Sequence, residues 1–388
     1  MKIAYVTKNN VLNKQDWSQY EQGLWSASYY ISKYLIDDLN SINYISTTGH
    51  KFRALTRAKW SYYRRFFKKD YYNWAEPLVL KDYARQIKRQ LLKKDFDIVL
   101  CPENVVPIAY LECKKPIVLW TDSTLSSLIN FYPHMGNLCQ ETIKNIYAME
   151  AVALHRCQML IYTSDWAAQT AIDTYGISSS KIKVLPWCAH LQSNRNLADI
   201  HNIMTSKPSS PCKLLFIGVD WVRKGGNTAL QVAQKLNNLG LKTELTVVGC
   251  QPQISHIPKF VKVINFIDKS KQEGLEEINK LFAEAHFFIL PSIADCTPIV
   301  LAEANSFGIP CLTTNVGGMA TLIKDGLNGK IFSLEASALD YCSYISSLMT
   351  HYSEYKKLAF SSFEEYQAKL NWNVTVERAK HFMSELIG

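Results

Sequence analysis

The sequence of 388 residues has no long hydrophobic run. A membrane-spanning helix needs about 20 mostly apolar residues, so we expect none here. The start, MKIAYVTKN, lacks an apolar stretch after a basic region, which argues against a signal peptide. The 10 cysteines show no spacing typical of a metal site, and in a chain without a leader they are expected to be reduced thiols. Together these absences predict a cytoplasmic protein.

Other signatures are missing as well. There is no Gly-x-Gly-x-x-Gly dinucleotide loop, no Walker loop and no cluster of metal ligands, so we expect neither a cofactor nor a required metal. The composition, 47% hydrophobic and 20% charged, is that of a globular protein. Because a single core rarely exceeds about 250–300 residues, two domains are expected.

Short apolar runs alternate with helical patterns along the chain, which predicts an α/β fold with parallel sheets. In the first part, strands are expected within 2–6, 96–102, 115–123 and 159–165. A polar segment over 196–212 is predicted to be a linker. The alternation then restarts, with strands expected at 213–219, 244–250, 261–267, 286–292 and 310–315. We therefore predict two doubly wound, Rossmann-like domains over 1–195 and 213–371, with a final helix over 372–388 that packs back on the first.

One loop of the second domain has the composition of a phosphate site. The strand KLLFIGV is followed by Arg223 and Lys224, then by Gly-Gly, Asn227 and a helical pattern. A helix start next to fixed cations favours an anion. The alternative is a solvated turn in which glycine supplies a positive φ.

A second loop carries two carboxylates in an otherwise apolar stretch. Thr297 is a plausible helix N-cap and Pro298 a plausible first helical residue, so Asp295 would precede the helix and Glu303 would follow its first turn. The helix start between them would favour a diphosphate. Such a site suits a nucleotide-sugar. The alternative places Glu303 in solvent and Asp295 in an ordinary loop.

These segments resemble the retaining GT-B glycosyltransferases of family 4, the glycosyl transferases group 1. DCTPIVLAEANSFGIP (295–310) is similar to their E-G-F-G-x-x-x-x-E-A-x-A-x-G-x-P pattern. TTNVGGMATLIKDGLNGKIF (313–332) is similar to T-x-x-G-G-x-x-E-x-I-x-D-G-x-N-G-x-L-F, and YTSDWAAQTAIDTYGISSSKIKVLPW (162–187) resembles a segment of the first domain. The resemblance covers most of the chain and implies two Rossmann-like domains facing a cleft.

The sequence departs from the family at several positions. Asp295 replaces the first glutamate, and Val219 stands at the family's arginine, whose charge Arg223 could supply. Asp122 stands where the family often has a histidine, and residues 24–28 replace a Gly-Gly loop. We interpret these differences as traits of a subfamily.

The resemblance implies roles for individual residues. Lys224, helped by Arg223, would neutralise the leaving diphosphate, and Asp295 would contact hydroxyls of the donor sugar. Asp122 would lie near the anomeric centre and the acceptor, and Glu303 would bind the ribose. The predicted catalytic residues are Asp122, Lys224 and Asp295. The predicted donor-binding residues are Arg223, Lys224, Phe266, Ile267, Asp295, Ile299, Val300 and Glu303.

The net charge of +9 is concentrated in one segment. Residues 51–94 contain 14 Lys or Arg and 3 Asp or Glu, and their aromatic part reads KWSYYRRFFKKDYYNW (59–74). This pattern fits a solvated basic helix face, an anionic membrane surface or a nucleic acid. Since the family often acts on membrane-borne acceptors, we favour contact with the inner membrane face or an anionic acceptor, and no nucleic acid.

The function predicted from these features is transfer of a hexose-type sugar, with retention, from a nucleotide-diphosphate-sugar to a hydroxyl of a glycan or lipid-linked acceptor. Preorganised cations would stabilise the leaving phosphate, so no metal is required. Two alternatives stay open. One is a nucleotide-sugar 2-epimerase, and the other is a non-catalytic GT-B protein that binds a glycan or a membrane.

Overall fold

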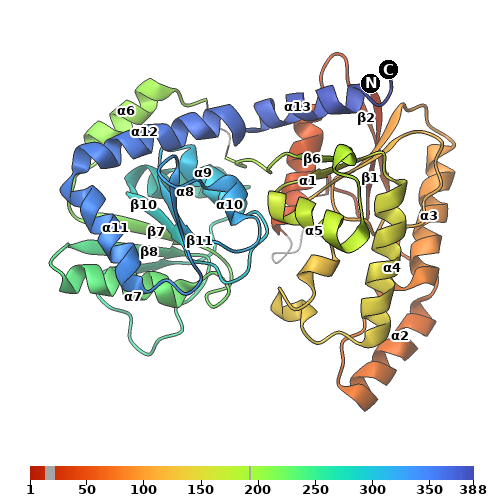
Figure 1. Cartoon of the computed structure of the whole chain (residues 1–388), viewed down its shortest axis with the longest axis horizontal. Helices are drawn as coiled ribbons and strands as arrows, with labels where there is room; N and C mark the ends of the chain where they lie inside the picture. Colours follow the sequence, from red (N-terminus) through yellow and green to blue (C-terminus); the bar gives the residue numbers. More distant parts are fainter. Residues whose placement is uncertain (14–21, 192–193) are drawn as a thin grey trace. The chain divides into compact units, whose positions relative to one another are not determined.

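The computed structural model describes residues 1–13, 22–191 and 194–388. Its chain divides into two compact units (Figure 1). Unit 1 comprises residues 1–187 and 375–388, and unit 2 comprises residues 188–374. Within the described residues, each unit contains one six-stranded sheet whose neighbouring strands pair in parallel.

The sheet of unit 1 has the strand order β2-β1-β3-β4-β5-β6. Its strands are β1 (Lys2–Thr7), β2 (Ser41–Ser46), β3 (Ile98–Cys101), β4 (Ile117–Thr121), β5 (Met159–Tyr162) and β6 (Ile182–Val184). Its main helices are α1 (Gln22–Leu35), α2 (Arg53–Tyr62), α3 (Pro77–Leu91), α4 (Gln140–Arg156), α5 (Asp165–Tyr175) and most of α13 (Trp372–Ser384). Strands β3, β4 and β5 are buried along their whole length, because helices cover both faces of the sheet.

The sheet of unit 2 has the strand order β12-β11-β10-β7-β8-β9. Its strands are β7 (Cys212–Ile217), β8 (Thr243–Val248), β9 (Val261–Ile264), β10 (Phe287–Leu290), β11 (Cys311–Thr314) and β12 (Gly329–Phe332). Its helices are α6 (Leu197–Ser206), α7 (Gly226–Asn238), α8 (Gln272–Glu284), α9 (Ile299–Asn305), α10 (Met319–Leu322), α11 (Ala338–Thr350) and α12 (Tyr352–Lys369). The predicted α/β fold with two doubly wound domains is confirmed.

The polar segment predicted to be a linker is largely helix α6. Asn196 caps this helix, because its Oδ1 accepts hydrogen bonds from the N–H groups of Ala198 and Asp199. Ile200 and Met204, one turn apart, are buried in the core of unit 2. The linker prediction was wrong here because these two buried residues, together with the partly buried Ile203, anchor the helix to that core.

The strand order of unit 2 determines where a ligand can bind. The chain passes from β7 to β8 and β9 on one side, and then returns to β10, β11 and β12 on the other. The order therefore reverses between β7 and β10. In open parallel sheets, ligands bind outside the carboxyl ends of the strands at such a switch point. The loops after β7 and β10, which carry Arg223, Lys224 and Asp295, lie there.

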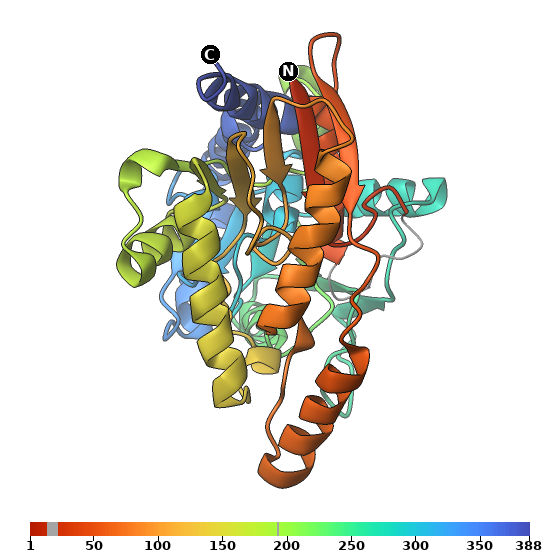
Figure 2. The same ribbon diagram turned by 90° about the vertical axis from the view of Figure 1, so that its right-hand side faces the viewer.

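Helix α2 projects from unit 1. In both views of unit 1 it extends beyond the end of the sheet (Figures 1 and 2). It continues into a single π-helical turn, η2 (Tyr63–Phe67). Across the described residues, no helix combines the length and the apolar character that crossing a bilayer requires.

Candidate functional site

The loops after β7 and β10 are joined through their backbones. Gly225 has a φ of +77° and precedes α7 as its N-cap. A Cβ atom on Gly225 would lie 1.9 Å from the carbonyl oxygen of Pro291, so glycine is needed for this close approach. The carbonyl oxygen of Arg223 also accepts a hydrogen bond of 2.9 Å from the N–H of Ile293. The two loops therefore form one fixed platform.

A buried ion pair occupies this platform. The ammonium of Lys224 lies 2.5 Å from Oδ2 of Asp295, and their side chains are 11% and 8% exposed. The hydroxyl of Ser292 donates a hydrogen bond of 3.0 Å to the same carboxylate oxygen. Burial lowers the pKa of Lys224, and the charge of Asp295 opposes that shift. Asp295 thus keeps a cation in a place that would otherwise favour the neutral amine.

Arg223 adds a second cation beside the same carboxylate. Its Nη1 donates a hydrogen bond of 2.9 Å to the carbonyl oxygen of Ala294 and lies 3.5 Å from Oδ1 of Asp295. Its backbone N–H donates to a carboxylate oxygen of Asp220, at 3.0 Å. Both cations are therefore held in fixed positions at the switch point. This arrangement suits an anionic ligand, because fixed charges in a partly dry site need little reorganisation.

The second predicted carboxylate lies on helix α9. Glu303 is 2% exposed, and its Oε1 lies 2.7 Å from the ammonium of Lys269 in the loop after β9. Helix α9 begins at Ile299, and Pro298 is its N-cap residue without a side-chain cap. The prediction of Thr297 as the N-cap and Pro298 as the first helical residue was therefore wrong by one position. The structure does bury Glu303, as a carboxylate with a cationic partner.

The remaining predicted donor residues lie around these carboxylates. Strand β9 ends at Ile264, three residues short of the predicted strand, so Phe266 and Ile267 belong to the following loop. Phe266 is 44% exposed, whereas Ile267 is buried. Ile299 and Val300 form the half-buried first turn of α9. All of these residues belong to unit 2.

Asp122 belongs to unit 1. It directly follows β4, is half-buried, and accepts a hydrogen bond of 3.2 Å from the hydroxyl of Ser123. Sequence reasoning missed another carboxylate of this unit, Glu103, which is buried just after β3. Glu103 accepts a hydrogen bond of 3.1 Å from the backbone N–H of Lys8, and so joins the loops after β1 and β3. The position of Glu103 after a buried strand could have indicated it, because unit 1 also reverses its strand order between β1 and β3, and ligands bind at such a point.

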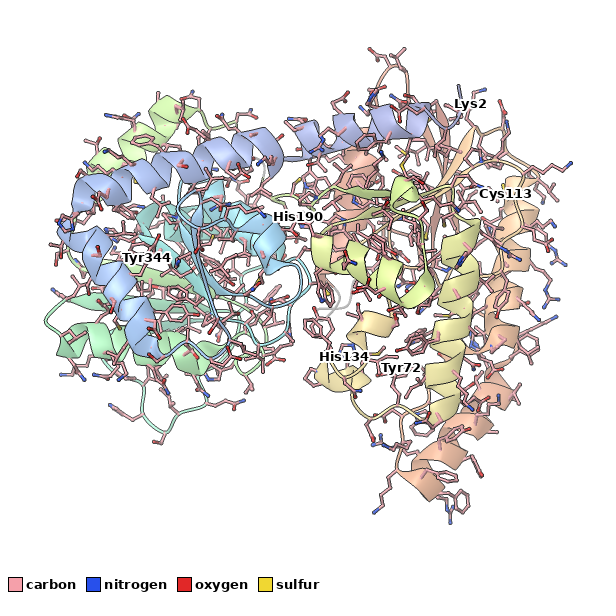
Figure 3. The ribbon with its side chains drawn as sticks, viewed as in Figure 1. Lys2, Tyr72, Cys113, His134, His190 and Tyr344 are labelled. Atoms are coloured by element: carbon pink, nitrogen blue, oxygen red, sulfur yellow. The ribbon has the colours of Figure 1, made fainter. Side chains whose placement is uncertain are left out.

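The histidines have structural surroundings. His286 bridges the N–H of Lys213 and the carbonyl of Pro208, and burial lowers its pKa to about 3. His134 lies beside Tyr72, whose hydroxyl donates to the His134 carbonyl at 2.6 Å (Figure 3). Among residues 1–13, 22–191 and 194–388, no group of three or more His, Cys, Asp or Glu residues could hold a metal ion.

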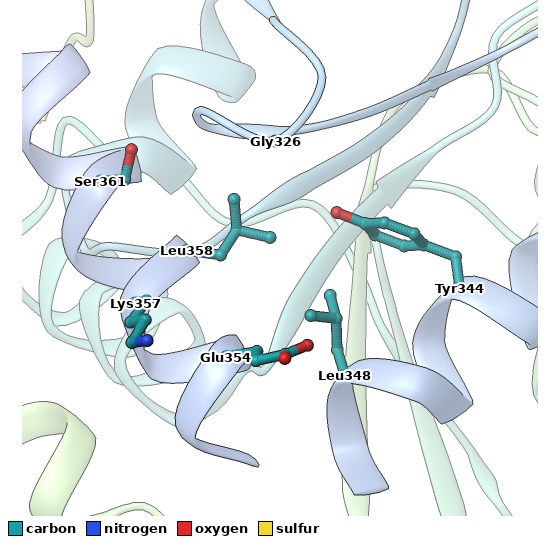
Figure 4. A pocket seen from close by; sticks show the side chains of 7 residues that line it. All are labelled: Gly326, Tyr344, Leu348, Glu354, Lys357, Leu358 and Ser361. Atoms are coloured by element: carbon teal, nitrogen blue, oxygen red, sulfur yellow. The ribbon is translucent and has the colours of Figure 1, made fainter. Parts of the chain in front are cut away.

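A cavity of about 310 Å³ lies elsewhere in unit 2 (Figure 4). Its lining comes from helices α11 and α12 and from Gly326, which precedes β12. It is therefore at the amino ends of the strands, away from the loops after β7 and β10. Figure 4 shows Tyr344 and Leu358 pointing into it from the two helices. Its apolar lining contains no pair of fixed cations comparable to Arg223 and Lys224 among the seven residues that form it.

Residues 211–351 match the family described as "Glycosyl transferases group 1". This stretch of unit 2 is similar to that family. This match contains the cations after β7 and both carboxylates, and it agrees with the resemblance seen in the sequence. The match covers most of unit 2, without residues 188–210 and 352–374, and none of unit 1.

Two curated relatives are similar to parts of the chain. A Klebsiella pneumoniae protein named "Uncharacterized 41.2 kDa protein in cps region" is 24% identical over 238 residues, which are 60% of this chain and 64% of that protein. An Escherichia coli "UDP-Gal:alpha-D-GlcNAc-diphosphoundecaprenol alpha-1,3-galactosyltransferase" is 32% identical over 73 residues, 19% of this chain and 18% of that protein. The chain thus spans less than two thirds of the length of these relatives.

A solved structure is similar over nearly the whole chain. Anabaena Alr3699/HepE, solved in complex with UDP and glucose, has a TM-score of 0.64 and 15% identity, covering 99% of this chain and 100% of that one. Identity at this level establishes the fold alone. The fold is of the GT-B class, with two Rossmann-like domains in one chain.

Proposed function

We propose that the protein is a retaining glycosyltransferase of family 4. It moves a hexose-type sugar from a nucleotide-diphosphate-sugar to a hydroxyl of a glycan or lipid-linked acceptor, and it requires no metal. The observation that carries this proposal is the cluster of Arg223, Lys224 and Asp295 at the switch point of unit 2. The match to glycosyl transferases group 1 supports it, since the cluster lies within residues 211–351.

In the proposed reaction, the bond between the anomeric carbon and the diphosphate oxygen breaks, and its electron pair goes to that oxygen. The acceptor hydroxyl forms a new bond to the anomeric carbon on the same face, and its proton passes to the departing phosphate. Negative charge grows on the phosphate as positive charge grows on the sugar. Lys224 and Arg223 stabilise the phosphate charge, and Asp295 holds them in position before the donor arrives.

The donor is held by residues around this cluster. Glu303 accepts hydrogen bonds from the ribose hydroxyls, and the base rests against Phe266 and Ile267. The backbone amides of Ile299 and Val300 line the sugar and the phosphates. Two observations support this set: the burial of Glu303 on α9, and the exposure of Phe266 in the loop after β9.

The acceptor is assigned to unit 1, near Asp122. The half-burial of this carboxylate after β4 supports its role beside the anomeric centre. In that position it would stabilise positive charge on the sugar and orient the acceptor hydroxyl. The name of the E. coli relative contains both a UDP-sugar and a diphosphoundecaprenol acceptor, which supports a lipid-linked acceptor here.

A membrane-borne acceptor would bring the protein to the cytoplasmic face of a membrane. We name the exposed residues of α2, η2 and the following Lys68 and Lys69 the basic aromatic tip. Its exposed aromatic and cationic side chains are Arg53, Arg57, Trp60, Tyr62, Arg64, Arg65, Phe66, Phe67, Lys68 and Lys69. Such a surface suits anionic lipid headgroups above an apolar interior.

The base of this tip is anchored to unit 1. The ammonium of Lys59 lies 2.8 Å from Glu76 and 2.6 Å from Glu141. The tip's outer cations are therefore presented from a fixed support. A hollow of about 410 Å³ on the tip is lined by Ala58, Ser61, Tyr62, Arg65 and Phe66. These features support contact with a bilayer surface without insertion of a helix.

Product analysis tests the transfer itself. The protein is incubated with UDP-, GDP- or ADP-sugars and a bacterial lipid extract, with EDTA present, and release of the nucleoside diphosphate is measured. The proposal expects release that depends on the extract, and a product whose anomeric configuration by NMR equals that of the donor. An inverted product would overturn retention. Conversion of the sugar without an acceptor would instead favour the epimerase.

A further inference from the structure

Lys269 was not among the residues that the sequence singled out, yet it contacts the buried donor carboxylate. Its ammonium lies 2.7 Å from Oε1 of Glu303, across 34 residues of sequence. The Glu303 side chain is 2% exposed and that of Lys269 is 39% exposed. The lysine therefore approaches the carboxylate from the solvent side, where a ligand would also enter.

The loop that carries Lys269 is fixed by its neighbours. The carboxylate of Asp268 accepts hydrogen bonds from the N–H of Ser270, at 3.0 Å, and from its hydroxyl, at 2.7 Å. The N–H of Lys271 donates to the Asp268 carbonyl at 3.1 Å. A Cβ on Gly274 would lie 2.2 Å from that same carbonyl oxygen, so the first turn of α8 packs tightly against this turn. This turn therefore holds the backbone of Lys269 in a fixed position beside Glu303.

A further ionisable neighbour of Lys269, His190, does not compete for it. His190 stacks on Trp372, with ring centroids 5.9 Å apart. Burial, and then the charge of Lys269, hold the pKa of His190 well below its usual range, so the imidazole is neutral. Glu303 is therefore the anionic partner of the Lys269 ammonium.

A buried charge carries a large desolvation cost unless it is paired. Lys269 supplies that partner to Oε1 of Glu303 and holds the carboxylate in one orientation. A donor on the ligand would then meet the other carboxylate oxygen, Oε2. A vicinal pair of hydroxyls on a ribose supplies such donors, and a site that depends on a hydroxyl strongly rejects the analogue that lacks it.

We propose that Lys269 is a positioning residue that holds Glu303 for the ribose of the donor and thereby sets the preference for a ribonucleotide over its 2′-deoxy analogue. This inference rests on the proposed function and deepens it, since it assigns sugar selectivity within the nucleotide to an ion pair between two loops. Lys269 itself need not touch the nucleotide.

The test compares the dissociation constants of ribonucleotide and 2′-deoxyribonucleotide by calorimetry. The probes are UDP with 2′-deoxy-UDP, GDP with 2′-deoxy-GDP and ADP with 2′-deoxy-ADP, measured on the full chain. For the pair that binds the wild type, Lys269→Met is expected to lower the ribo-to-deoxyribo ratio at least tenfold, chiefly through weaker ribonucleotide binding. Lys269→Arg should keep most of the ratio. The matched control Lys271→Met, an exposed lysine of the same loop, should leave it unchanged.

Lys269→Met could destabilise the fold, because it leaves the buried carboxylate of Glu303 without its partner. A second comparison keeps the test decisive in that case. In a Glu303→Gln background, adding Lys269→Met should change the ratio no further, because the lysine acts through the carboxylate. A further loss in that background would overturn the inference, as would a wild-type ratio in a folded Lys269→Met variant. If the wild type binds none of these nucleotides, the proposed function itself fails. If the wild type binds one and the folded Lys269→Met variant keeps its ratio, only the inference about Lys269 fails.

Discussion

The ammonium of Lys224 and the carboxylate of Asp295 lie 2.5 Å apart, on loops that follow two neighbouring strands at the switch point of unit 2. The pair is nearly dry, and Arg223 lies beside it. Removing one partner of a buried pair leaves the other charge uncompensated. The relationship therefore links stability to the proposed chemistry, because the same residues that hold the loops together would meet the diphosphate.

Lys224→Met is expected to lower the rate of sugar transfer by roughly 100- to 1,000-fold, the usual effect of removing one preorganised charge from a transition state. Steady-state kinetics should show the loss in kcat more than in KM. The control Lys242→Met removes an exposed lysine of the same unit and should keep full activity. Equal activity of both variants would remove Lys224 from the mechanism.

Because the backbone at Gly225 lies close to Pro291, the variants Gly225→Ala and Gly240→Ala should lose different amounts of stability. Gly225 and Gly240 both have positive φ, +77° and +89°, but only Gly225 would bring a Cβ against Pro291, since nothing lies within 4 Å of a Cβ on Gly240. Gly240→Ala should cost about 1 kcal/mol from backbone strain alone. Gly225→Ala should cost at least about twice as much in urea unfolding. Equal losses would show that the loops are not clamped together.

The free energy of unfolding should depend on pH through a buried lysine, Lys207, which precedes strand β7 of unit 2. Lys207 donates a hydrogen bond to the carbonyl of Ala285, and burial lowers its pKa from 10.5 to about 7. The unfolded chain binds more protons between those values, so this group makes stability rise with pH from about 7 to 10. The slope is roughly 1.4 kcal/mol per pH unit.

The contribution of Lys207 is fully present above its unfolded pKa and is lost as the pH falls towards 7. Lys207→Met should therefore be more stable than the wild type near pH 6 and should lack this slope in denaturant titrations. Lys242→Met serves as the charge-matched control. A variant that keeps the wild-type slope would assign it to other groups.

The basic aromatic tip predicts selective binding to anionic vesicles. Replacing the exposed Phe66 and Phe67 by serine should abolish most co-sedimentation with phosphatidylserine-containing vesicles and leave the fold intact. The same double change at Leu239 and Ile257, two exposed apolar residues of unit 2, is the matched control. Vesicles of phosphatidylcholine alone should bind neither protein, since about 1 kcal/mol per cation comes from the anionic surface. Equal binding of both double variants would contradict a role for the tip.

Much of the fold and part of the site were predictable from the sequence. Buried parallel strands appear as continuous apolar runs, and the residues after them must lie at one edge of the sheet. That reasoning led to Arg223, Lys224 and Asp295, which the structure brings together. It also led to the buried position of Glu303.

Other features required coordinates. Nothing in the spacing indicates that Lys269 pairs with Glu303, because the pairing depends on how the loop after β9 folds. Helix α6 was missed because the segment 196–212 is polar on the whole, although Ile200, Ile203 and Met204 pack on the core of unit 2. Both misses arise from tertiary packing, which overrides local composition.

The central claim is that unit 2 binds a nucleotide-diphosphate donor, and a thermal-shift panel tests it most directly. UDP, GDP, ADP and CDP, with their common sugars, are added to the wild type and to Glu303→Ala, with and without Mg²⁺. A ligand at about 100 times its Kd should stabilise the fold by about 2.7 kcal/mol. The account predicts that one nucleotide shifts the wild type without needing metal and that the variant loses the shift. If no nucleotide shifts the wild type, or if the variant responds equally, the proposed donor site is wrong.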